Sequence, residues 1–84
     1  MPPIAEKIYD IILLTGRSMT INEIVDFFNL HYSPPFANYK MIYDAIYREW
    51  EKDNYVFYID DQFNDYRIHI DKKYYLLGGR MIGP

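Results

Sequence analysis

Two histidines, His31 and His69, are the residues of this sequence best suited to acid, base or metal chemistry near neutral pH. No HExxH metal-binding motif, glycine-rich phosphate loop or nucleophile elbow accompanies them. His31 ends an apolar helical pattern, where positive charge favours the helix dipole. His69 alternates with apolar residues, as the solvent side of a strand does. We therefore expect a chain that is not an enzyme and that has no cofactor or metal site.

The acidic stretch over residues 60–65, Asp-Asp-Gln-Phe-Asn-Asp, has side chains that can bind a cation. An EF-hand loop alternates oxygen ligands around a central glycine and ends on a bidentate glutamate. This stretch has neither the glycine nor the glutamate. Aspartate and asparagine are also common turn formers, because their side chains bond to the local backbone. The stretch therefore predicts a turn between two strands.

The composition limits the partners and the cellular setting of the chain. Its 84 residues carry a formal net charge of −3 and no cysteine. Proteins that hold nucleic acid by overall electrostatics have a basic surplus, so any DNA contact here requires a local basic face. Disulfides and cysteine-based metal or redox motifs are excluded. No apolar run approaches the roughly 18–20 residues of a membrane span, and the N-terminus lacks a secretory signal pattern. We expect a cytoplasmic protein without membrane contact.

Apolar spacing predicts two helices in the first third of the chain. The first covers about residues 3–15, because isoleucines recur at helical spacing after two prolines and Gly16 supplies a stop. The second covers about residues 21–30. It begins with a capping box, in which the Thr20 hydroxyl serves the Glu23 N–H and the Glu23 carboxylate reaches back to the Thr20 N–H.

A third helix is predicted over about residues 39–53. Two prolines at 34–35 oppose continuation of the second helix, and Asn38 is a suitable N-cap. We expect Phe36, in the connection, to enter the core. The side of the helix predicted to be buried carries Tyr39, Ile42, Tyr43, Ile46 and Trp50. The opposite side carries Lys40, Asp44, Arg48, Glu51 and Lys52.

The last third of the chain predicts a β-hairpin. Tyr55–Ile59 is rich in aromatic and β-branched residues, and Tyr66–Ile70 alternates apolar with polar residues. Arg17–Met19, between the first two helices, is a short connection or a minimal strand. We expect one domain over residues 1–84, with a core over about 4–77 and a flexible tail at 78–84. The predicted core residues are Ile8, Ile12, Ile24, Phe28, Ile42, Ile46, Trp50, Phe57 and Ile68.

This order resembles the winged-helix superfamily, an α+β fold with a three-helix helix-turn-helix core followed by a β-hairpin wing. The residues that carry the resemblance are the Thr20–Glu23 start, the stripe of Tyr39, Ile42, Ile46 and Trp50, and the hairpin Tyr55–Ile70. The small size, the richness in isoleucine and tyrosine and the lack of cysteine are also similar to small DNA-binding proteins of hyperthermophilic archaea and their viruses.

The resemblance implies a small transcriptional regulator whose third helix enters the major groove of double-stranded DNA while the wing contacts the backbone or the minor groove. Arginine and lysine bind phosphate or guanine, and asparagine binds adenine. A homodimer on adjacent half-sites would gain affinity despite the low charge, and surplus tyrosines are suited to that contact. The candidate DNA-binding residues are Asn38, Lys40, Tyr43, Tyr47, Arg48, Arg67, His69, Lys72 and Lys73.

The alternative is a winged-helix protein–protein interaction module that does not bind nucleic acid, for instance one docking on transcription machinery. Asp44 and Glu51 lie one helical turn either side of Arg48 and can neutralise it. A continuous positive stripe around the third helix would favour DNA, and a mixed or acidic surface with a flat aromatic patch would favour a protein. Both interpretations require Lys40 and Arg48 to be exposed and the segment after Trp50 to form a ribbon.

Overall fold

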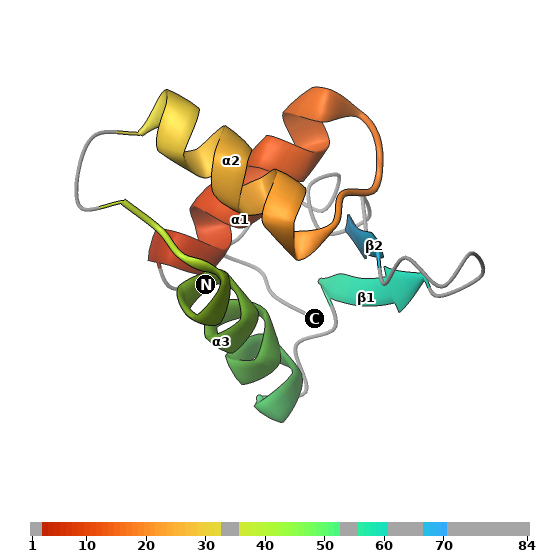
Figure 1. The fold of residues 1–84 in the computed structure, drawn as a ribbon. Coiled ribbons are helices and arrows are strands. Elements are labelled where there is room, and N and C mark those ends of the chain that lie inside the picture. The colour runs from red at the N-terminus through yellow and green to blue at the C-terminus, as the bar shows by residue number, and fades with distance from the viewer. Residues whose placement is uncertain (1–2, 33–35, 53–55, 61–66, 71–84) are drawn as a thin grey trace.

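The structure, a computed structural model, is an α+β fold of three helices followed by a two-stranded antiparallel sheet. It describes residues 3–32, 36–52, 56–60 and 67–70. The elements are α1 (Pro3–Thr15), α2 (Ile21–His31), α3 (Tyr39–Glu51), β1 (Phe57–Asp60) and β2 (Arg67–Ile70) (Figure 1). This order is compatible with a winged-helix layout. None of the helices in the described ranges is long and apolar enough to cross a membrane.

The turn from α1 to α2 follows the local signals in the sequence. Gly16 has a φ of 72°, a left-handed conformation that suits glycine after a helix. The capping box of α2 is complete. The Glu23 N–H donates to the Thr20 hydroxyl and the Thr20 N–H donates to the Glu23 carboxylate, both at 3.1 Å. Both helix boundaries predicted here are confirmed.

Asn29 fixes the chain before α3. Its side-chain amide donates to the Ala37 carbonyl at 3.0 Å and accepts from the Ala37 N–H at 2.6 Å. Asn38 then caps α3 by accepting from the Met41 N–H at 2.9 Å, as predicted. The prediction that Phe36 enters the core is wrong, since this side chain is 62% exposed. Ala37 occupies the buried position instead, and Asn29 holds it there.

The sheet pairs with the connection between α1 and α2. Phe57 pairs with Ile70 and Ile59 pairs with Ile68 across the antiparallel strands. Met19 forms a β-bridge with Ile68, in which the Met19 N–H donates to the Ile68 carbonyl at 3.0 Å and the Met19 carbonyl accepts from the Ile68 N–H at 2.6 Å. The minimal strand expected at this connection is therefore a single bridging residue. The turn was predicted over residues 60–65, but Asp60 is the last residue of β1; residues 61–65 and everything after Ile70 lie outside the described residues.

The core lies where the three helices and the sheet meet. Each helix contacts the other two, α1 contacts β2 and α3 contacts β1 (Figure 1). All of the predicted core residues are buried except Trp50, which is half-buried at the rim. Tyr9, which the sequence did not single out, is fully buried, and its ring meets Phe57 edge to face at 6.4 Å. Tyr9 therefore links α1 to the hairpin.

The side of α3 that faces the core differs from the predicted one. Ile42, Ile46 and Glu49 are buried, whereas Tyr39 and Tyr43 are exposed to 52% and 45%. The predicted burial of these tyrosines is wrong. Compared with the predicted orientation, α3 is rotated about its own axis, so that Met41 and Ala45 face the start of α1. The rotation leaves a row of aromatic rings on the surface.

Candidate interaction surface

Three tyrosines form the most distinctive exposed feature of α3. Tyr39, Tyr43 and Tyr47, here called the tyrosine ladder, follow one another at four-residue spacing. Their rings are nearly parallel, with centroids 6.3 and 6.1 Å apart and interplanar angles of 14° and 8°. Each ring is about half exposed. The ladder offers flat apolar faces edged by phenol hydroxyls, which suits contact with a partly polar partner.

Trp50 joins the ladder to the hairpin. Its ring meets Tyr47 edge to face at 6.4 Å, and its indole N–H donates to the Phe57 carbonyl at 2.7 Å. A shallow hollow of about 300 Å³ continues from Trp50 over β1 and is lined also by Phe57, Tyr58 and Ile59. The hairpin side of α3 therefore presents aromatic surface from Tyr39 to β1.

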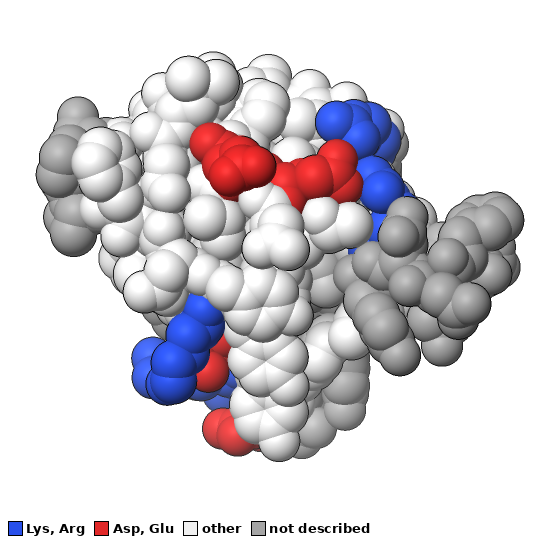
Figure 2. All heavy atoms as spheres, in the orientation of Figure 1, with Lys and Arg blue, Asp and Glu red and all other residues white. Residues whose placement is uncertain are grey.

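The charged side chains of α3 lie on another side of the helix. The Lys40 ammonium pairs with the Asp44 carboxylate at 3.0 Å, and both side chains are accessible to solvent. In Figure 2, acidic and basic side chains gather along one side of α3, and the side nearer the hairpin is uncharged. The positive stripe that would favour DNA is not formed by the described residues of this helix.

Arg48 is exposed and lines a hollow of about 410 Å³ between α3 and the first turn of α1. It follows Tyr47 by one residue, so it points about 100° further round the helix. Asp44, which was expected to neutralise it, pairs with Lys40. Within the described ranges no carboxylate lies within ion-pair distance of Arg48. The candidates Tyr47 and Arg48 thus occupy different sides of α3.

Arg67, a candidate for DNA contact from the wing, is engaged inside the molecule. Its guanidinium donates to the Ser18 hydroxyl at 3.1 Å and to the Ser18 carbonyl at 2.8 Å, and it forms an ion pair with the Glu23 carboxylate at 3.1 Å. Its side chain is only 25% exposed. These contacts join β2 to the α1–α2 connection.

Glu23 receives hydrogen bonds from several sides, and its pKa is lowered from the usual value of 4.5. The largest cause is the hydrogen bond from the Thr20 backbone N–H, which burial partly opposes. The nearby Arg67 charge lowers the pKa further, and Arg17 contributes through its own ion pair at 3.2 Å. The charged form of the Glu23 carboxylate therefore binds the Thr20 N–H, Arg17 and Arg67 at the same time.

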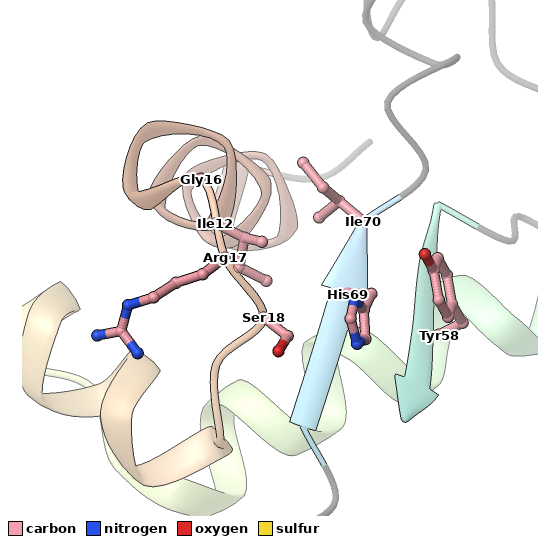
Figure 3. Close-up of a pocket in the computed structure, with 7 residues that line it drawn as sticks. All are labelled: Ile12, Gly16, Arg17, Ser18, Tyr58, His69 and Ile70. Carbon is pink, nitrogen blue, oxygen red and sulfur yellow. The ribbon is translucent and has the colours of Figure 1, made fainter. Parts of the chain in front are cut away.

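His69 and Tyr58 lie side by side on the two strands, with ring centroids 5.0 Å apart and an interplanar angle of 7° (Figure 3). They line an open hollow of about 560 Å³, together with Ser18 and the end of α1. Arg17, also at this hollow, points away from it toward α2. In the part of the chain that the structure describes, no three histidine, aspartate or glutamate side chains are placed to hold a metal ion.

The other candidates have simpler placements. His31 is the last residue of α2, as expected, and its ring stacks on Phe27 at a centroid distance of 4.3 Å. Asn38 is exposed, with its side-chain oxygen used by the helix cap. Lys72 and Lys73 lie outside the described residues. The structure thus brings the candidates Tyr43 and Tyr47 together with Tyr39, although Tyr39 and Tyr43 were both predicted on the buried side of the helix.

No family model, curated protein or solved structure matches this chain. The candidate surface therefore depends on the geometry alone. The four-residue spacing of the tyrosines was the signal in the sequence that could have identified it, because residues four apart on a helix are neighbours on one side.

Proposed function

We propose that this chain is a winged-helix protein–protein interaction module and that the tyrosine ladder is its contact surface. The observation that carries the proposal is the exposure of three parallel rings on the hairpin side of α3. Tyrosine is enriched at protein interfaces and among their energetically dominant residues. The three-helix order, the hairpin and the Met19 bridge to Ile68 support the winged-helix part of the proposal.

The charges support a protein partner more than a duplex at this surface. The net charge is −3, whereas a duplex brings roughly one phosphate charge per 1.7 Å of its axis. Lys40 forms an ion pair with Asp44. Arg67 donates a hydrogen bond to Ser18 and forms an ion pair with Glu23. A neutral aromatic surface avoids the cost of removing charged groups from water.

Double-stranded DNA binding by a small transcriptional regulator is the second candidate function. The observation that favours it is the exposure of both Lys40 and Arg48 on α3. A duplex would then contact the charged side of the helix, with Asn38 at its N-terminal end, rather than the ladder. Such binding would weaken steeply with added salt, because it releases counterions from the phosphates.

Two paired variants separate these functions. Tyr43→Ser/Tyr47→Ser removes most of the ladder, and Lys40→Ala/Arg48→Ala removes the exposed cations of α3. All four side chains are accessible to solvent, so both variants should keep the wild-type circular dichroism spectrum. Leu14→Ser, which changes a 76% exposed apolar residue on α1, is the matched control.

The variants are compared in two assays. In affinity capture from a lysate of the source organism, followed by mass spectrometry, we expect proteins that the wild type and Leu14→Ser retain and the tyrosine variant loses. In fluorescence anisotropy with a random-sequence duplex pool at about 50 and 200 mM salt, we expect no binding. Salt-dependent duplex binding that disappears in Lys40→Ala/Arg48→Ala would replace the proposed function with the second candidate.

A further inference from the structure

We infer that the partner on the tyrosine ladder is a second copy of this chain, with the two α3 helices packed antiparallel about a twofold axis. This inference depends on the proposed function, because it names the partner of the same surface. Three properties of the ladder indicate this partner: its shape, the charges at its two ends and the area that it can bury.

The ladder has the shape of a helix-packing ridge. Residues four apart form rows inclined to the helix axis, and such rows from two helices interdigitate at a crossing angle of about −50°. Tyr39, Tyr43 and Tyr47 are one such row, with regular ring spacings of 6.3 and 6.1 Å. A twofold axis brings the same row from each copy together, as an isologous contact requires.

The charges beside the ladder make it complementary to an inverted copy of itself. Lys40 stands at its first end and Glu51 at its last, both exposed, and Lys40 also forms an ion pair with Asp44 of its own helix at 3.0 Å. They are about three helical turns apart and therefore lie on the same side of α3. If the helices cross between Tyr43 and Tyr47, Lys40 and Glu51 lie roughly 8 and 9 Å from the crossing point. An antiparallel pair then places each Lys40 beside Glu51 of the second copy, whereas a parallel pair would place like charges together.

The area of the ladder indicates a reversible dimer. A fully buried tyrosine covers about 150–250 Å², so three half-exposed rings contribute roughly 300 Å². Stable interfaces bury about 800 Å² on each partner. The exposed Phe36 can add to the contact. The total buried area still favours association in the micromolar range.

Sedimentation equilibrium of the full chain, from about 1 to 500 μM to bracket micromolar association, tests the inference. We expect a monomer–dimer equilibrium in the wild type and in Leu14→Ser. Tyr43→Glu should raise the dissociation constant at least about tenfold, because a charge would be buried at the centre of the interface. Lys40→Glu and Glu51→Lys should each raise it about three- to tenfold, since each reverses two exposed pairs per dimer.

The combined variant Lys40→Glu/Glu51→Lys provides the decisive measurement. It exchanges the two charges and should return the dissociation constant to near the wild-type value, an outcome that general destabilisation cannot produce. A wild type that remains monomeric throughout, or a dimer that Tyr43→Glu does not weaken, overturns the inference. A dimer that the combined variant fails to restore overturns the antiparallel arrangement. Affinity capture tests the proposed function separately, because a monomeric chain can still lose protein partners with Tyr43→Ser/Tyr47→Ser.

Discussion

The Arg67 guanidinium lies 3.1 Å from the Glu23 carboxylate, so the second strand of the hairpin is bonded directly to the capping box of α2. The same guanidinium donates to the backbone carbonyl of Ser18 at 2.8 Å. Ser18 adjoins Met19, the residue that bridges to Ile68. The hairpin is therefore attached to the α1–α2 connection by backbone and side-chain contacts at one place.

Replacing Arg67 should destabilise the fold. Arg67→Ala removes bonds to Ser18 and Glu23, and we expect the free energy of unfolding to fall by about 1–2 kcal/mol, because the site is only partly screened from water. For a domain of this size the melting temperature should fall by about 4–8 °C per kcal/mol. Thermal unfolding followed by circular dichroism measures the change. Arg48→Ala, at an exposed arginine, should alter stability by less than about 0.5 kcal/mol; equal effects of the two variants would assign Arg67 no structural role.

The stability contributed by Glu23 should depend on pH. Its folded-state pKa is lowered below 4.5, chiefly by the Thr20 backbone N–H. A lowered folded-state pKa means that this contribution is fully present above the unfolded pKa and is lost as the pH falls through the folded pKa. In urea unfolding, the wild type should therefore exceed Glu23→Gln in stability at pH 7, and the difference should shrink as the pH falls below 4.5. A difference that is constant from pH 7 to the acid limit would contradict the assignment.

Asn29 should be the residue on which the start of α3 depends. Its side chain makes two hydrogen bonds to the backbone of Ala37, which is buried. Asn29→Ala leaves those backbone groups without their partners, and we expect a loss of about 1–3 kcal/mol in the free energy of unfolding. Hydrogen exchange of the amides in the first turn of α3 should also accelerate. Asn22→Ala, at an exposed position of α2, is the matched control and should leave that exchange unchanged.

Local signals in the sequence predicted the helix bounds to within two residues, since the capping box at Thr20 and the N-cap Asn38 act on their own neighbours. The role of Arg67 could not be predicted in this way, because its partner Ser18 lies 49 residues away in the sequence. The buried side of α3 was also set by tertiary contacts. Rows through Ile42 and through Tyr43 both fit a helical period, and tyrosine suits either a core or a surface.

A pair of substitutions on α3 tests which of these rows is buried. Ile46 is fully buried, so Ile46→Ala should lower the free energy of unfolding by about 2–5 kcal/mol. Tyr43 is 45% exposed, and Tyr43→Ala loses only its contacts with neighbouring rings, each worth about 0.2–0.5 kcal/mol. Alanine also favours the helix by a similar amount, so the net change should stay within about 0.5 kcal/mol.

Urea unfolding should be measured at low micromolar protein, where self-association contributes least to apparent stability. A large loss for Tyr43→Ala with little loss for Ile46→Ala would return the tyrosines to the core. The ladder would then be absent from the surface, and the protein-interaction proposal would lose its physical basis.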